Sequence, residues 1–140
     1  MRKKIIYLDD EPLCLRLFEA AFGEEYDVRV AETPTQARAL VSQGAPDVFI
    51  CDQRLGASSG TDFLAEVAAR CPSSYRVLLT GTAVLGGVLT EIGSGVVEAF
   101  VTKPWTEEGV RHLLARAEMR RLECGPPAAS RPMGAPQPVR

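Results

Sequence analysis

Acidic, hydroxyl and ammonium side chains occur in this sequence at the points where short apolar runs end. Asp9 and Asp10 follow the first apolar run of the chain, Asp52 follows another, and Thr80 and Lys103 follow two more. Clustered carboxylates repel one another and need a cation, and a site made of oxygen ligands favours Mg²⁺. With such a cation and a lysine nearby, a carboxylate can attack a phosphoryl group and form an acyl phosphate.

Each of these residues also has an ordinary structural role when it is taken alone. The segment Asp9–Pro12 is a good helix start, with acids at the positive end of the helix dipole and a proline in the first turn. Thr80 precedes Gly81 and suits a turn, and an isolated Asp52 or Lys103 suits a solvated surface. Their joint placement after successive apolar runs is what indicates chemistry.

Short apolar runs alternate along the chain with amphipathic stretches. The runs predict strands over residues 4–8, 26–30, 47–51, 76–79 and 98–101. The amphipathic stretches predict helices over residues 12–22, 34 to about 44, 61–70, 84–92 and 105–121. Leu13, Leu17 and Ala20 form one apolar stripe on the first helix, Thr33 is the expected cap of the second, and residues 56–60 are expected to form a loop.

Five strands that alternate with five helices predict an α/β fold with a parallel sheet covered on both faces. The spacing suits the flavodoxin-like, doubly wound (βα)5 arrangement with strand order 2-1-3-4-5. Ligands of such sheets bind beyond the carboxyl ends of the strands. We therefore expect the acids, the threonine and the lysine to converge at one edge.

The length of 140 residues fits one domain, which we place at residues 1–124. Residues 125–140 contain five of the ten prolines and no acids, which predicts a disordered tail or linker. The net charge of −2 argues against direct nucleic-acid binding, and no apolar run is long enough to insert into a membrane. Four widely spaced cysteines and one histidine indicate reduced thiols in a cytoplasmic protein rather than a zinc site.

The sequence resembles the receiver domain of two-component response regulators over residues 3 to about 121. The matching segments are Leu8–Glu11, Cys51–Leu55 with Gly60 downstream, Leu78–Gly81 and Phe100–Trp105. The segments Leu-Leu-Thr-Gly and Lys-Pro-Trp are similar to those of receivers fused to cyclic-di-nucleotide phosphodiesterase or enhancer-type transcription outputs.

The resemblance implies a role for each residue of the predicted site. Asp52 accepts the phosphoryl group. Asp10, Asp52 and the backbone carbonyl of Arg54 bind Mg²⁺ directly, and Asp9 assists through water. Thr80 and Lys103 contact the phosphoryl group after transfer, Phe100 is the switch aromatic, and the Lys103–Pro104 bond is cis.

The same resemblance implies partners and a limited chemistry. The phosphoryl donor would be a sensor histidine kinase or a phosphotransfer protein, and the signal would pass to a downstream protein or a fused output domain. The output surface, and the face of a possible homodimer, would combine residues 84–92, 98–101 and 105–121. The domain would be a phosphoryl acceptor with slow self-dephosphorylation rather than a turnover enzyme.

Two departures from the family pattern concern the loop after Asp52. The proline that usually lies four residues after the acceptor is Gly56 here, which suggests a looser loop. Arg54 and Thr82 occupy the positions that tune phosphoryl lifetime in the family, and a long Arg54 side chain either shields the acyl phosphate or engages it.

Three alternatives use similar residues. A phosphatase of the haloacid dehalogenase type needs an acid two residues after its nucleophile, where this chain has Arg54. A flavodoxin-like electron carrier needs a phosphate-binding loop after the first strand, and the acids there would repel a phosphate. A receiver that works by binding alone would not need the full set of Asp52, Thr80 and Lys103.

Overall fold

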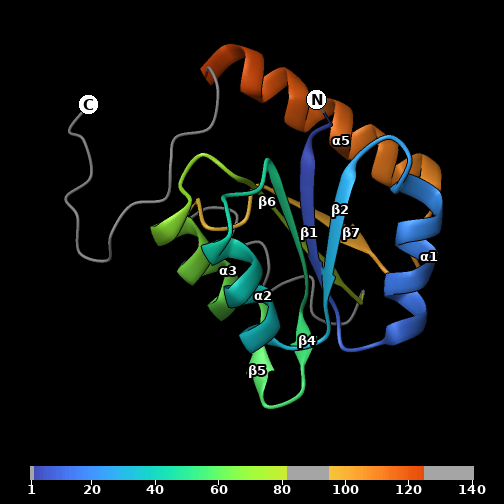
Figure 1. Cartoon of the computed structure of the whole chain (residues 1–140), viewed down its shortest axis with the longest axis vertical. Helices are drawn as coiled ribbons and strands as arrows, with labels where there is room; N and C mark the ends of the chain where they lie inside the picture. Colours follow the sequence, from blue (N-terminus) through green and yellow to red (C-terminus); the bar gives the residue numbers. More distant parts are fainter. Residues whose placement is uncertain (1, 82–94, 125–140) are drawn as a thin grey trace.

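A parallel sheet of five strands lies at the centre of the computed structural model, which describes residues 2–81 and 95–124 (Figure 1). In the order β2-β1-β3-β6-β7, the strands are β2 (Asp27–Ala31), β1 (Lys4–Leu8), β3 (Val48–Asp52), β6 (Tyr75–Thr80) and β7 (Ala99–Thr102). The described helices are α1 (Pro12–Phe22), α2 (Pro34–Ser42), α3 (Gly60–Arg70) and α5 (Glu107–Cys124). All four strand pairings in the sheet are parallel.

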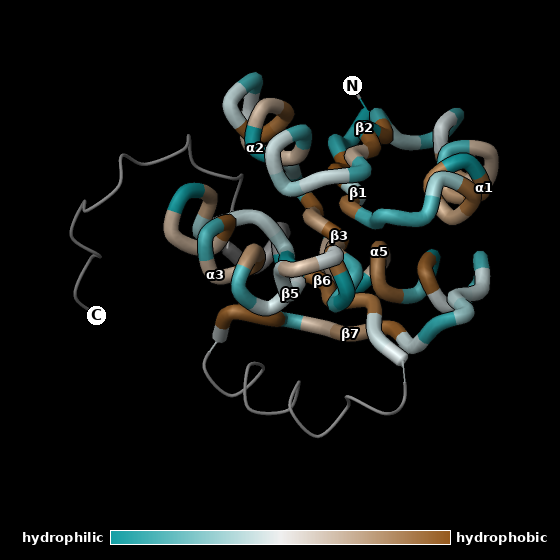
Figure 2. Tube along the Cα trace, turned by 90° about the horizontal axis from the view of Figure 1, so that it is seen from below, coloured by the Kyte–Doolittle hydropathy of each residue, from teal (hydrophilic) through white to brown (hydrophobic). Residues whose placement is uncertain are grey.

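Helices cover both faces of the sheet, with α2 and α3 on one side and α1 and α5 on the other (Figure 2). Because side chains alternate along a strand, β1 contributes to both layers. Ile6 and Leu8 pack toward Leu64 of α3, whereas Ile5 and Tyr7 belong to the layer that contains Phe18 of α1. Two-sided burial explains why the central strands β1 and β3 are almost continuously apolar.

The predicted fold class and strand order are confirmed, since the fourth and fifth strands of the sheet are β6 and β7. Observed strand ends differ from the predicted ones by one residue at most places, so that Asp52 and Thr80 are the last residues of their strands rather than the first residues after them. The helix expected at residues 84–92 lies outside the described residues.

The apolar stripe of α1 that was singled out in the sequence does not face the core. Leu13 and Leu17 are 60% and 53% exposed, and Ala20 is exposed as well. The buried residues are instead Leu15, Phe18 and Phe22, which follow the same helical spacing. Two apolar stripes compete on this helix, and the one with two phenylalanines removes more apolar area from water.

A short hairpin that the sequence did not predict spans residues 54–59 and overlaps the loop expected at residues 56–60. β4 (Arg54–Leu55) pairs antiparallel with β5 (Ser58–Ser59). Gly56 lies in the turn with a φ of 67°, a conformation that glycine adopts without steric cost. A glycine at this position therefore permits a tight turn directly after the acid-bearing strand.

Side-chain caps mark the start of α2, α3 and α5. At the start of α3 the Ser59 hydroxyl accepts the backbone amide of Asp62 at 3.2 Å. The Thr33 hydroxyl accepts the Gln36 amide at 3.2 Å, as predicted. In the last helix the Thr106 hydroxyl accepts the Gly109 amide at 3.0 Å, so α5 begins at Glu107 and not at Trp105. Among the helices in the described ranges, none combines the length and apolar character that crossing a bilayer requires.

Candidate functional site

Three carboxylates meet at the carboxyl edge of the sheet, as the strand pattern predicted. One oxygen from each of Asp9, Asp10 and Asp52 lies within 4.8 Å of the others. Asp9 follows β1 and is fully buried, Asp52 ends the neighbouring strand β3 and is 5% exposed, and Asp10 is exposed. The cluster therefore has a buried floor and one carboxylate at its mouth.

Lys103 joins the two buried carboxylates. Its ammonium lies 3.0 Å from Oδ2 of Asp9 and 3.1 Å from Oδ2 of Asp52. The Lys103 amide donates to the Thr80 carbonyl at 3.0 Å, which fixes this residue at the end of β7 beside β6. The following Lys103–Pro104 bond is cis, as the family resemblance implied.

Opposing electrostatic effects act on the Asp52 carboxyl group. Burial raises the pKa of Asp52 most, and the charge of Asp9 raises it further, to about 6. Lys103 and the backbone amide of Arg54 act in the opposite direction, because they favour the ionised form. Burial disfavours the Lys103 ammonium, but Asp9 and Asp52 outweigh it and hold the pKa of Lys103 above its usual range. One ammonium thus does not compensate the negative charge of three carboxylates.

A close backbone contact fixes the end of β3. The Gly60 amide donates to the Gln53 carbonyl at 2.9 Å, and the Gln53 amide donates to the Leu79 carbonyl at 2.8 Å. A Cβ atom on Gly60 would lie 2.3 Å from the Asp52 carbonyl oxygen. Only glycine permits α3 to begin this close to the acid-bearing strand.

The other residues of the predicted site surround the acids at different distances. The Arg54 amide donates to Oδ1 of Asp52 at 3.3 Å, and Arg54 lines the same cavity of about 320 Å³ as Asp10, Asp52 and Lys103. Thr80 is buried at the end of β6, but its hydroxyl donates to the Gly81 carbonyl at 3.1 Å rather than to an acid. Thr82 lies outside the described residues.

Phe100 does not reach the acid cavity in this structure. It lies on β7 opposite Leu78 of β6, and its partly buried ring packs against the core layer of α2 and α3. Strand β6 lies between β7 and the strand of Asp52, so Phe100 has no direct contact with the acid cavity.

Tyr7 belongs to the site, although the sequence analysis treated it as part of a buried strand. Its hydroxyl donates to Oδ2 of Asp9 at 2.6 Å, and both residues are fully buried. Burial and this hydrogen bond hold the pKa of Tyr7 well above its usual range, so the phenol remains a neutral donor. The sequence feature that could have indicated this contact is the two-residue spacing between Tyr7 and Asp9, because alternate residues of a strand share a face.

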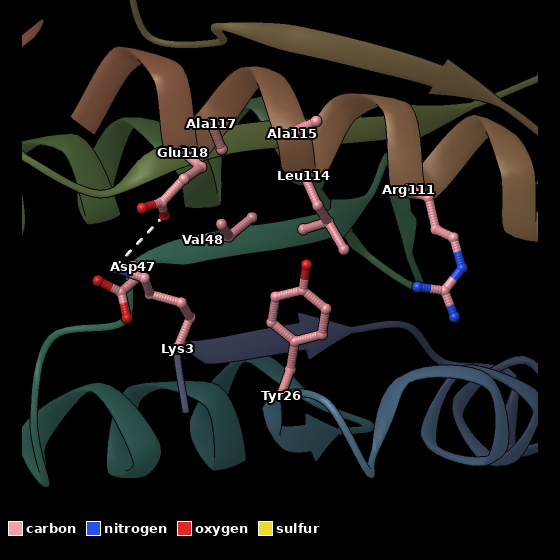
Figure 3. A pocket seen from close by; sticks show the side chains of 9 residues that line it. All are labelled: Lys3, Tyr26, Asp47, Val48, Arg111, Leu114, Ala115, Ala117 and Glu118. Carbon is pink, nitrogen blue, oxygen red and sulfur yellow. Dashed lines mark ion pairs between the residues drawn. The ribbon is translucent and has the colours of Figure 1, made fainter. Parts of the chain in front are cut away.

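A second cavity, of about 410 Å³, lies at the opposite end of the sheet between α5 and residues that precede the strands (Figure 3). Its charged side chains are already paired. Lys3 lies 3.3 Å from Glu118, and Arg111 lies 2.8 Å from Glu25 and 3.1 Å from Glu107. The carboxyl edge is therefore the stronger candidate for chemistry.

The model of the response regulator receiver domain family matches residues 5–115, which include all of the acids and Lys103. The chain belongs to this family. It is 30% identical over 142 residues to the response regulator protein PilR of Pseudomonas aeruginosa, covering 99% of this chain and 32% of PilR. It is 26% identical over 104 residues to the hydrogenase transcriptional regulatory protein HoxA of Cupriavidus necator, covering 74% of this chain and 22% of HoxA.

A solved structure has the same fold as this receiver domain. The signal receiver domain of an HD domain-containing protein from Pseudomonas fluorescens superposes with a TM-score of 0.79 at 25% identity, covering 87% of this chain and 90% of that one. The chain spans between about a fifth and a third of the length of HoxA and PilR. Its relation to those proteins therefore concerns the receiver domain alone.

The residues of this receiver domain fit a small divalent cation. Every candidate ligand is an oxygen, namely the three carboxylates and the backbone carbonyl of Arg54, and hard cations such as Mg²⁺ prefer oxygen. Burial, followed by the charge of Asp9, raises the pKa of Asp52 and so disfavours its ionised form. A divalent cation at the exposed side of the cluster would supply positive charge that favours this form.

In metal-free buffer at pH 7, we expect Asp52→Asn to raise the free energy of unfolding by about 1–3 kcal/mol. The pKa of Asp52 rises from 3.8 to about 6 on folding, so the folded chain holds this proton more tightly than the unfolded chain. Wild-type stability therefore falls as pH rises from about 4 to about 6. The difference in free energy of unfolding between Asp52→Asn and the wild type should reach its full size above pH 6 and disappear below pH 4.

Urea unfolding at several pH values measures this difference. Asp62→Asn is the matched control, because Asp62 is an exposed acid in the first turn of α3. Saturating Mg²⁺ should stabilise the wild type more than Asp52→Asn, so the difference between their free energies of unfolding should become smaller. An Asp52→Asn variant less stable than the wild type at pH 7 would contradict the charge imbalance described above.

Proposed function

We propose that this receiver domain takes a phosphoryl group from a sensor histidine kinase or a phosphotransfer protein onto Asp52. A carboxylate oxygen of Asp52 attacks phosphorus, the bond from phosphorus to the donor nitrogen breaks, and an acyl phosphate forms. The observation that carries the proposal is the contact of Lys103 with both Asp9 and Asp52 beside Asp10. A receiver that only binds partners would not need this arrangement.

Four groups would hold the cation in this proposal. Asp10, Asp52 and the backbone carbonyl of Arg54 would bind Mg²⁺ directly, and Asp9 would assist through water. Bound Mg²⁺ supplies positive charge that offsets the phosphoryl oxygens during transfer. Lys103 is already 3.1 Å from Asp52 and is positioned to pair with a phosphoryl group there.

Thr80 and Phe100 would carry the response away from the site. In the state described here the Thr80 hydroxyl donates to the Gly81 carbonyl and not to Asp52. We infer that a phosphoryl group on Asp52 draws the Thr80 hydroxyl toward it, and that Phe100 on the adjacent strand fills the space released. Two packed arrangements of this kind carry a small shift to a surface.

The output of the domain is also a proposal. HoxA is a hydrogenase transcriptional regulatory protein, and this chain matches 22% of its length. We infer a downstream protein or a fused output domain, with a possible homodimer through residues 84–92, β7 and α5. Residues 84–92 lie outside the described residues. We propose that the protein acts in the cytoplasm.

Acetyl phosphate, a small phosphoryl donor, tests the proposed function directly. We expect the purified chain to gain one phosphoryl group in the presence of Mg²⁺, measured by intact mass. Chelation of the metal should prevent the gain, and hydroxylamine should remove it, because an acyl phosphate is labile to this nucleophile. A chain that binds Mg²⁺ and never gains mass would indicate a receiver that works by binding alone.

We propose residues 1–124 as the receiver domain and residues 125–140 as a tail or linker. Truncation after Cys124 is expected to change the Tm by less than about 2 °C, because the C-terminal segment lacks an apolar burial pattern. Thermal unfolding of the full and truncated chains measures the difference. A loss of several degrees would show that residues 125–140 contribute to folding.

A further inference from the structure

Tyr7 occupies the centre of a network that links the acid cluster to the core. It lies on β1 two residues before Asp9, so both side chains project from the same face of the sheet. Its ring packs against Phe18 of α1 with centroids 4.9 Å apart, and its hydroxyl donates to Oδ2 of Asp9 at 2.6 Å. The ring thus contributes to the core, and the hydroxyl faces the site.

The hydrogen bonds of Asp9 determine which of its oxygens can face a cation. Oδ2 accepts both the Tyr7 hydroxyl and the Lys103 ammonium, at 2.6 and 3.0 Å. Oδ1 accepts the Glu11 amide at 3.0 Å. Each carboxylate oxygen accepts about two hydrogen bonds. Oδ2 is therefore fully used, and the remaining acceptor site is on Oδ1.

We propose that Tyr7 is a positioning residue that orients Asp9 for the cation and limits its hold on Lys103. The inference rests on the proposed function, since it concerns the same Mg²⁺ and phosphoryl site. By donating to Oδ2, Tyr7 prevents the carboxylate from rotating and leaves Oδ1 as the oxygen with an unused acceptor site. Hydrogen-bond partners of this kind fix the orientation of metal ligands.

The same contact affects Lys103, which is shared between two carboxylates. The Lys103 ammonium lies at nearly equal distances from Asp9 and Asp52. The phenol draws negative charge from Oδ2 of Asp9, which weakens the attraction of that oxygen for the ammonium. Lys103 is thereby kept available for Asp52 and for a phosphoryl group bound to it.

The variant Tyr7→Phe keeps the ring against Phe18 and removes only the hydroxyl. We expect the affinity for Mg²⁺ alone, measured by calorimetric titration, to fall about 10-fold. The rate of labelling by acetyl phosphate at saturating Mg²⁺ should also fall, because Lys103 is held more firmly by Asp9. Tyr26→Phe is the matched control, since Tyr26 lines the cavity at the opposite end of the sheet, and its Mg²⁺ affinity should equal that of the wild type.

An affinity of folded Tyr7→Phe within twofold of the wild type would overturn the proposal. If the variant does not fold, the wild type still decides by NMR: a slowly exchanging Tyr7 hydroxyl proton that shifts on addition of Mg²⁺ supports the role, and one that does not respond overturns it. A different result would contradict the proposed function. A wild-type chain that binds Mg²⁺ and never accepts phosphoryl groups contradicts that function while leaving the Mg²⁺ measurement on Tyr7 valid.

Discussion

Asp52→Asn is expected to lower phosphoryl uptake from acetyl phosphate by at least about 100-fold at saturating Mg²⁺, as the loss of a nucleophile does. Asp52 ends the central strand β3, is 5% exposed, and contacts Lys103 at 3.1 Å. An asparagine fits the same space and keeps the Arg54 amide contact, but its amide is a poor nucleophile. The loss therefore reports on chemistry and not on folding.

Intact mass and the rate of label incorporation measure this effect. Asp62→Asn is again the control, because it removes an exposed acid outside the cavity and should label like the wild type. Undiminished labelling of Asp52→Asn would move the acceptor to another residue. Since Asp10 is the exposed acid of the cluster, a mass shift located there by peptide mapping would be the informative alternative.

The acid site could be predicted from the sequence because a parallel sheet has a simple geometry. Strands that run the same way end at the same edge, so Asp9, Asp52, Thr80 and Lys103 had to converge once the strand order was known. Apolar runs located the strands to within about one residue. That precision sufficed to identify the edge, although it placed Asp52 just after its strand instead of at its last position.

Contacts that depend on packing were not predictable in the same way. Period-two alternation places Tyr7 on the same face as Asp9, but it does not determine a 2.6 Å hydrogen bond between them. On α1, periodicity permitted two apolar stripes, and packing against the sheet selected Phe18 and Phe22 over Leu17. A local pattern limits such choices, and the shape of the core decides them.

Arg76 shows the same limit for a charged residue. It is the first residue of the strand predicted over residues 76–79, where a lone arginine has no evident partner in the sequence. In the structure its side chain is 7% exposed and lies 2.9 Å from Glu98, which also contacts Arg120 at 2.8 Å. Glu98 lies about 20 residues away along the chain, and its second partner Arg120 lies another 22 residues further on, at a range that sequence spacing does not resolve.

Arg76→Met is expected to lower the free energy of unfolding by about 3–5 kcal/mol, the range for breaking a buried ion pair. An arginine has five N–H donors, and Arg76 forms four hydrogen bonds to backbone carbonyls besides its ion pair with Glu98. Besides Glu98, its acceptors are the carbonyl oxygens of Pro72, Ser74, Gly95 and Val96, at 2.8 to 3.3 Å. Methionine fills part of the volume but leaves these buried acceptors and the Glu98 carboxylate without their donor.

Urea unfolding of Arg76→Met and of Arg29→Met compares the loss of a buried ion pair with the loss of an exposed one. Arg29 also pairs with an acid, Asp27 at 2.8 Å, but the two side chains are 47% and 33% exposed, so its loss should lower the free energy of unfolding much less than the loss of Arg76 does. Adding Glu98→Leu to Arg76→Met should recover part of the loss, because it removes the buried charge that lacks a partner. If Arg76→Met is no less stable than Arg29→Met, the four hydrogen bonds and the ion pair of Arg76 do not hold the base of β6 to the start of β7. The stability of this end of the sheet must then come from apolar packing.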